Sequence, residues 1–176
     1  MNLFLTQLSP EDEAEFISFH NEFINAGGRV YPGIINKYRG DFPAYLAYIA
    51  RQADVHLIPA GFVESDTYIM KDENGKIYGM SSLRHRLTDG LLIGAGHIGY
   101  GIRPSERGKG YGTHQLALLL VKCRELNIEK VLVTCDKDNP ASAKVAINNG
   151  GVLEDEIIEE DGNILQRYWI NISHSV

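Results

Sequence analysis

The most regular hydrophobic pattern of the chain lies between residues 113 and 126, directly after a glycine-rich run. Its apolar positions have the spacing i, i+3, i+4, i+7 and i+10, which places them on one face of an α-helix: Leu116, Leu119, Leu120, Cys123 and Leu126. The preceding residues 94–112 read GAGHIGYGIRPSERGKGYG. Their first half, as far as Pro104, has the apolar character of a strand. We therefore predict a long strand over 91–103, a glycine loop and then this helix.

The glycine loop is the first candidate site. No Ser, Thr, Asp or Asn stands at the start of the helix to cap it, and the loop contains two cations, Arg107 and Lys109. The first amide groups of a helix have no partner within it, and the helix dipole adds positive potential there. These features predict a phosphate-binding site. The alternative is a plain turn that joins a strand to a helix.

Two better-known phosphate motifs do not fit this region. A P-loop requires Gly-x-x-x-x-Gly-Lys-Ser/Thr, but here Arg103 occupies the first glycine position and Gly110 replaces the hydroxyl residue. The pattern G-x-G-x-x-G occurs at residues 94–99. A dinucleotide site needs a helix directly after it, whereas residues 100–104 continue as strand and reach a proline. Neither motif is therefore assigned.

The remaining pattern alternates between helical and β character. Ser9 and Pro10 are typical of a helix start, Asn74-Gly75 of a hairpin turn, and Asn139-Pro140 of another helix start. The elements predicted in chain order are a strand over 2–8, a helix from Ser9 to Gly27, a helix from Asp41, strands around 66–72, 76–87 and 91–103, the helix after Gly112, a strand over 130–135, a short helix from Asn139 to Gly150, and strands over 152–159 and 164–172.

Composition and charge narrow the function classes. The chain has 176 residues, 44% hydrophobic and 23% charged, which is ordinary for one globular domain. A formal net charge of −6 argues against general binding to nucleic acid or to an anionic membrane. The N-terminal residues do not resemble a signal peptide, and the longest apolar run, 116–121, is too short to span a bilayer. We expect a cytoplasmic protein without a membrane segment.

The two cysteines are predicted to be buried. Cys123 lies on the apolar helix face, and Cys135 lies in a short β-rich run. Both are expected to be reduced thiols of the core, and neither a disulfide nor a metal site is predicted.

The order of the elements resembles that of the GNAT superfamily of acyl-CoA-dependent N-acyltransferases. Residues 107–112 are similar to its Arg/Gln-x-x-Gly-x-Gly/Ala loop, residues 102–104 to the hydrophobic-x-Pro step before that loop, and Asn139 with its short helix to a second signature. The motifs cover residues 95–153, and the preceding hairpin extends the match to residue 67. A bacterial subgroup of predicted acetyltransferases is also similar, but it indicates no substrate. The resemblance implies one mixed α/β domain of α+β type over residues 1–176, with a central, mostly antiparallel, splayed sheet flanked by helices.

The resemblance also implies roles for particular residues. The pyrophosphate of coenzyme A would lie on the loop Arg107, Gly108, Lys109, Gly110, Tyr111 and Gly112. The pantetheine arm would pair with the backbone of Tyr100, Gly101 and Ile102, where an amide near Tyr100 or Gly101 would face the thioester oxygen. A bulge at Gly99 or Gly101 would splay this strand from the next. Asn139 would contact the pantetheine or only cap its helix.

The reaction also needs groups that accept and return protons. An amine must be neutral to attack a thioester, so a base or a water relay must accept its proton. His97 is the first candidate base and His85 the second, and a structural role is the alternative for His97. The family often has a Tyr acid seven residues after the Asn, where this chain has Ala146. Another group would then act as the acid, or coenzyme A would leave as the thiolate.

The predicted function is transfer of an acetyl group from acetyl-CoA, a co-substrate, to a primary amine by direct attack on the thioester, without a metal. A longer acyl chain, a hydroxyl acceptor or a non-catalytic acyl-CoA-binding module are the alternatives. The acceptor, a small molecule or a peptide, is expected between residues 10–54 and the last strands. A homodimer, common in the family, is a further expectation, and nucleic acid is not expected to be a partner.

Overall fold

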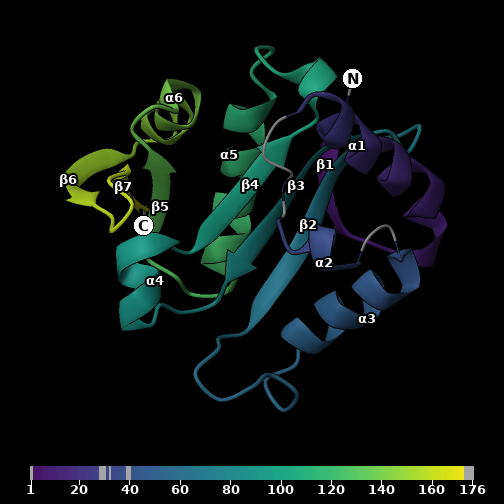
Figure 1. The fold of residues 1–176 in the computed structure, drawn as a ribbon, viewed down its shortest axis with the longest axis horizontal. Helices are drawn as coiled ribbons and strands as arrows, with labels where there is room; N and C mark the ends of the chain where they lie inside the picture. The colour runs from purple at the N-terminus through teal and green to yellow at the C-terminus, as the bar shows by residue number, and fades with distance from the viewer. Residues whose placement is uncertain (1, 28–30, 32, 39–40, 173–176) are drawn as a thin grey trace.

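The structure is a computed structural model, and it describes residues 2–27, 31, 33–38 and 41–172 of the chain. Within these residues the centre of the fold is a seven-stranded sheet in the order β1-β2-β3-β4-β5-β7-β6 (Figure 1). Neighbouring strands are antiparallel except for β4 and β5, which are parallel. The predicted fold class, a mostly antiparallel sheet flanked by helices, is confirmed.

Most elements agree with the predicted ones to within a few residues. The strands are β1 (Leu3–Gln7), β2 (Ser65–Asp72), β3 (Ile77–Arg84), β4 (Ile98–Ile102), β5 (Lys130–Asp136), β6 (Val152–Ile158) and β7 (Ile164–Asn171). The helices are η1 (Pro10–Asp12), α1 (Glu13–Asn25), α2 (Ile35–Tyr38), α3 (Phe42–Gln52), α4 (Asp89–Gly94), η2 (Pro104–Glu106), α5 (Tyr111–Glu125) and α6 (Pro140–Asn148).

The prediction of a single strand over 91–103 is wrong in its first half. Residues Asp89–Gly94 form helix α4, and only Ile98–Ile102 belong to β4. The hydroxyl of Thr88 accepts a hydrogen bond from the amide of Leu91, 3.3 Å away, and therefore caps α4. Residues 88–90 are thus a helix start. The apolar run that follows fits a strand or a helix, and the cap at Thr88 decides for the helix.

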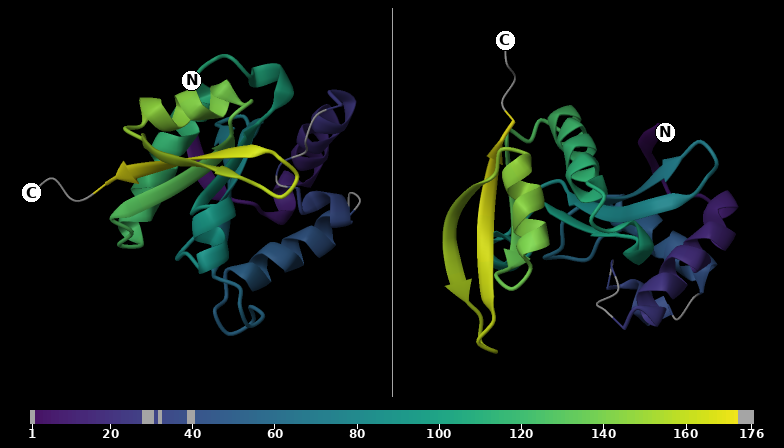
Figure 2. Two further views of the ribbon diagram at one scale, coloured as in Figure 1. Left: turned by 60° about the vertical axis from the view of Figure 1, so that its left-hand side comes forward. Right: turned by 90° about the horizontal axis from the view of Figure 1, so that it is seen from above.

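Two layers of helices cover the sheet. Helix α5 packs on one face of β1, β3 and β4, whereas α1 and α3 contact β3 and β2 on the other (Figure 2). Four of the predicted core positions of α5 are buried: Leu116, Leu119, Leu120 and Cys123. On the opposite face Phe16, Phe19 and Phe23 of α1 are buried. No helix of the described chain is long and apolar enough to cross a membrane.

The sheet opens between its two parallel strands. Strands β4 and β5 share one register pair, Ile98 with Val133, and beyond it they diverge. Two hydrogen bonds close the narrow end: the amide of His97 donates to the carbonyl of Leu132 (2.8 Å), and the amide of Leu132 donates to Nδ1 of His97 (3.0 Å). The predicted splay is therefore present.

The predicted bulge is absent from the pairing of β4 with β3. Their register runs without a shift from Leu83 opposite Ile98 to Gly79 opposite Ile102. Gly99 and Gly101 serve a different purpose. A Cβ on Gly101 would lie 2.6 Å from Cβ of Tyr31, and a Cβ on Gly99 would overlap the hydroxyl of Tyr31. The two glycines leave the space in which this tyrosine crosses the strand.

Candidate functional site

The loop before α5 has the geometry of an anion site. Gly108 and Gly110 have φ angles of +76° and +86°, a conformation that side chains with a Cβ rarely adopt. Gly110 is the N-cap residue of the 15-residue helix α5 and supplies no capping side chain. Residues 110–113 line a cavity. Uncapped first-turn amides, the positive end of a long helix dipole and a cavity in front of them fit a pyrophosphate.

The two cations of this loop have different surroundings. The guanidinium of Arg107 lines the cavity, where its Nε donates to the carbonyl of Ile102 (3.2 Å) and the group lies 5.2 Å from the Phe23 ring. Lys109 is not among the lining residues, and its ammonium group donates to Glu106 at 2.9 Å. Hydrogen bonds from Lys76 and Lys109 hold the pKa of the Glu106 carboxyl below its ordinary value. Of the two loop cations, Arg107 is therefore the one that a phosphate in the cavity would meet.

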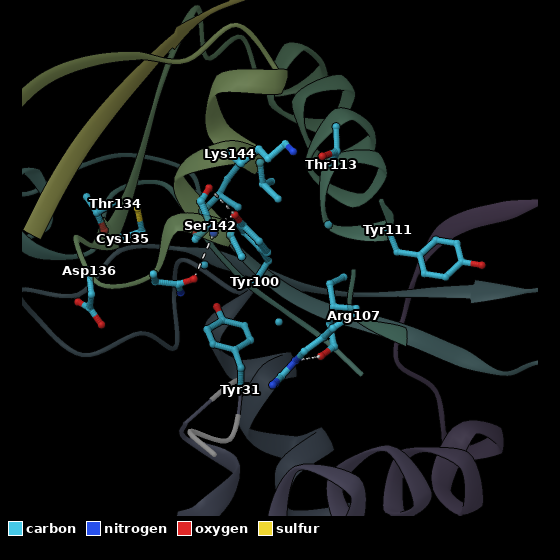
Figure 3. A pocket seen from close by; sticks show the side chains of 18 of the residues that line it. Tyr31, Tyr100, Arg107, Tyr111, Thr113, Thr134, Cys135, Asp136, Ser142 and Lys144 are labelled. Atoms are coloured by element: carbon cyan, nitrogen blue, oxygen red, sulfur yellow. Dashed lines mark hydrogen bonds between the residues drawn. The ribbon is translucent and has the colours of Figure 1, made fainter. Parts of the chain in front are cut away.

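The cavity extends from this loop into the splay between β4 and β5 (Figure 3). Its volume is about 1020 Å³, which is enough for a large cofactor-sized ligand. Tyr100, Gly101 and Ile102, whose pairing with pantetheine stays a prediction, line it. Because β4 pairs with β5 only at Ile98, the backbone of these three residues on that side is not used by the sheet.

Asn139 joins the cavity to the helix that follows it. Its Oδ1 accepts a hydrogen bond from the amide of Ser142 at 3.2 Å, so it is the N-cap of α6, and the residue also lines the cavity. The capping role is thus present, and contact with a ligand stays a prediction.

The side chain of Tyr100 reaches into the splay, although the sequence assigned a role only to the backbone of this residue. The hydroxyl of Tyr100 lies 2.9 Å from Oγ of Ser142 at the start of α6 (Figure 3). Burial raises its pKa to about 12, so the hydroxyl keeps its proton at neutral pH. Ala146, which stands where the GNAT acid is often found, is fully buried in the core. The hydroxyl of Tyr100 therefore extends from β4 toward α6, whereas the family tyrosine at position 146 would extend from α6 itself.

Comparison with known proteins identifies the family. The family profile described as Acetyltransferase (GNAT) domain matches residues 2–152. The chain belongs to the GNAT acetyltransferase family. Such a domain is an acyltransferase that uses acetyl-CoA. No protein in the curated set matches the sequence.

Solved GNAT structures share the fold at low sequence identity. A spermidine N-acetyltransferase SpeG chimera from Vibrio cholerae aligns with a TM-score of 0.69 and 18% identity, covering 97% of this chain and 96% of that one. The yncA acetyltransferase from Salmonella typhimurium, solved with acetyl-CoA, aligns with a TM-score of 0.61 and 14% identity, covering 99% and 96%. A Salmonella typhimurium enzyme that modifies the N-terminal serine of ribosomal protein L7/L12 aligns with a TM-score of 0.66 and 18% identity, covering 98% of this chain and 96% of that one.

The two histidines predicted as GNAT bases lie outside the cavity lining. His97 is buried directly before β4, and its Nδ1 accepts the amide hydrogen of Leu132. A neutral ring with an acceptor at Nδ1 carries its proton on Nε2, so neither nitrogen is free to take a proton. Nε2 of His85 lies 2.9 Å from a carboxylate oxygen of Asp66. The catalytic assignment of both stays a prediction, and the contacts of His97 favour its structural role.

His97→Gln is expected to change stability more than turnover. Burial, together with the nearby charge of Arg84, lowers the pKa of His97 to about 4. The unfolded chain binds a proton near pH 6.5 but the folded chain does not, so wild-type stability falls as the pH drops from about 6.5 to 4, by ~3 kcal/mol from this residue. Urea unfolding of both proteins at pH 7 and pH 4.5 should show this part of the pH dependence lost in the variant. A folded variant with kcat reduced 100-fold or more would restore His97 as the base.

Proposed function

We propose that the protein transfers the acetyl group of acetyl-CoA to the primary amine of a small molecule or peptide, within one domain over residues 1–176. The observation that carries this proposal is the uncapped start of α5, with left-handed glycines at its entrance, opening into the cavity between the splayed strands β4 and β5. The expected homodimer is part of the proposal and awaits measurement in solution.

The cavity offers groups that could bind each part of acetyl-CoA in turn. The pyrophosphate would lie on the amides of residues 108–112, next to Arg107. The amides of pantetheine would pair with the backbone of residues 100–102, which β5 leaves unpaired. The thioester would then reach the narrow end of the splay. There a backbone amide near Tyr100 or Gly101 would stabilise the negative charge that develops on its oxygen.

The reaction requires two proton movements. The neutral amine attacks the carbonyl carbon, the C–N bond forms and the C–S bond breaks, giving an amide and the thiol of coenzyme A. No histidine of the described chain lines the cavity. Glu106 lines it but pairs with Lys76 and Lys109, and the other lining carboxylates belong to Asp136 and Glu159. We assign removal of the amine proton to water or to these carboxylates, and return of a proton to sulfur to Tyr100.

The test measures thiol release from acetyl-CoA in the presence of a panel of primary amines, and mass spectrometry identifies the acetylated product. We expect release that depends on the amine and saturates with acetyl-CoA. Binding of acetyl-CoA by calorimetry without any transfer would indicate the non-catalytic binding module. Faster transfer from longer acyl-CoA donors, or to alcohols, would show that the donor or acceptor class is wrong.

A further inference from the structure

Arg84 is a cation on the wall of the cavity to which the proposed chemistry assigns no role. It is the last residue of β3, and it lines the cavity. Its Nη1 donates to the carbonyl oxygens of Ala95 (3.2 Å) and Gly96 (3.1 Å), directly after α4. These two bonds use one end of the guanidinium group, which has five donors in all. They fix the group in place and leave donors for a ligand.

The charge of Arg84 has no counterion within the described chain. Other half-buried or buried arginines do: Arg103 pairs with Glu15 and Glu22, and Arg167 pairs with Asp155. Arg84 is itself partly buried, and no carboxylate of the described residues lies within salt-bridge distance of it. A partly desolvated cation without a counterion favours the binding of an anion next to it. This local attraction is present although the net charge of the whole protein is −6.

The position of Arg84 excludes the phosphates of coenzyme A as that anion. Gly79 pairs with Ile102 next to the phosphate loop, whereas Leu83 pairs with Ile98 at the narrow end of the splay. Arg84 lies five residues along β3 from Gly79, about 17 Å at the usual rise of a strand. The group is therefore near the end of the cavity where the thioester would react.

The sheet face on which Arg84 lies shows from which side of the sheet an anion would reach it. Side chains alternate along a strand, so Arg84 shares a face with Ser82, whose Oγ lies 3.0 Å from the hydroxyl of Tyr31. Tyr100 lies on the opposite face, against α6. Burial raises the pKa of Tyr31 and of Tyr48, and the charge of Arg84 acts on both in the opposite direction. Arg84 thus faces the α1–α3 side, away from α5 and α6.

We propose that Arg84 binds a carboxylate of the acetyl acceptor, so that the substrate is an amino acid or a similar amine that carries a free carboxylate. The proposal rests on the acetyl-transfer function above and specifies its acceptor. A planar guanidinium matches a carboxylate in a two-bond geometry, and it would repel a polyamine. Asp136 and Glu159, which line the same cavity, suit the ammonium form of the amine before it loses its proton.

The test compares amines in pairs that differ only in the carboxylate. L-amino acids and their carboxamides are assayed with acetyl-CoA, together with spermidine, against wild type and the variants Arg84→Gln, Arg84→Lys and Arg86→Gln. Arg86 is exposed, is not among the lining residues and is two positions away, so it is the matched control. Circular dichroism and the KM for acetyl-CoA verify folding and donor binding for each variant.

Wild type is expected to prefer the acids to their amides. Arg84→Gln should raise KM for the acids about 10- to 100-fold, the range for one charge-assisted pair, and leave the amides unchanged. Arg84→Lys should recover part of the loss, and Arg86→Gln should behave as wild type. Equal loss for acids and amides, or a preference for spermidine, would overturn the assignment of Arg84 while acetyl transfer itself stands.

Two further outcomes are informative. One shows whether the carboxylate belongs to the acyl donor or to the acceptor, and the other shows whether the proposed acetyl transfer itself fails. If Arg84→Gln impairs only transfer from succinyl-CoA, then the carboxylate belongs to the acyl donor, and the assignment to the acceptor is wrong. If acetyl-CoA binds but no amine is acetylated by wild type, then the proposed function fails, and the acceptor assignment fails with it.

Discussion

Gly110→Asp is expected to abolish binding of acetyl-CoA while the protein stays folded. The substituted carboxylate would stand at the N-cap of α5, in the position where the pyrophosphate meets the first-turn amides. It would satisfy these amides itself and repel the phosphates. An acidic group at a helix N-terminus interacts favourably with the dipole, so α5 should persist. Calorimetry with acetyl-CoA should show a Kd raised about 100-fold or more, equal to the ~3 kcal/mol or more expected when a charged hydrogen-bonding site is lost.

Gly110→Asn is the matched control for this change. Both side chains have nearly the same size, and both pay the cost of a positive φ, which Asn and Asp tolerate better than other residues. No atom outside its chain neighbours lies within 4 Å of a Cβ at Gly110, so neither variant clashes with the fold. The Asn variant should bind at most about tenfold more weakly than wild type, the equivalent of ~1.4 kcal/mol. Equal binding by wild type and Gly110→Asp would mean that the loop is a structural turn.

The parts of the site that the sequence predicted depend on local signals. The loop with Gly108 and Gly110 could be identified because a glycine-rich run without a capping residue precedes a helix, and the apolar spacing of residues 116–126 identified the helix. The positive φ angles of both glycines agree with that loop. The same reasoning located Asn139 at the start of α6. These predictions need only the chemistry of neighbouring residues, and the structure confirms the elements on which they rest.

The parts that could not be predicted depend on contacts between distant segments. Gly99 and Gly101 make room for Tyr31, which lies in a segment whose local pattern predicts no element. The family resemblance that made His97 a candidate base says nothing about its ring, whose Nδ1 accepts a hydrogen bond from the amide of Leu132 in another strand. Alternation along β3 indicates the face of Arg84, but the absence of a counterion among the described residues emerges only in three dimensions.

Tyr100→Phe is expected to lower kcat by about 10²- to 10³-fold, within the range for loss of a general acid. The hydroxyl of Tyr100 lines the cavity and lies 2.9 Å from Oγ of Ser142, and Ala146 cannot supply a proton. The KM for acetyl-CoA should change little, because the phosphates bind at the other end of β4. Since the pKa of Tyr100 is about 12, the protonated form is present at every working pH below it. Wild type should therefore show no alkaline decline from this group up to about pH 11, and the variant should lower the rate without changing the shape of the profile.

A purely structural role for the Tyr100 hydroxyl predicts a different set of results. Ser142→Ala removes the same hydrogen bond but leaves the proton donor, so it should lose much less activity than Tyr100→Phe. Tyr168→Phe removes a hydroxyl that donates to Gln166 on β7, away from the cavity lining, and serves as the matched control. When the acetyl donor is a thioester of a more acidic thiol, the thiolate leaves without needing a proton. The loss of activity in Tyr100→Phe should therefore be smaller with such a donor. If Ser142→Ala and Tyr100→Phe lose activity equally with both donors, then the hydroxyl positions α6 against β4, and coenzyme A leaves as the thiolate.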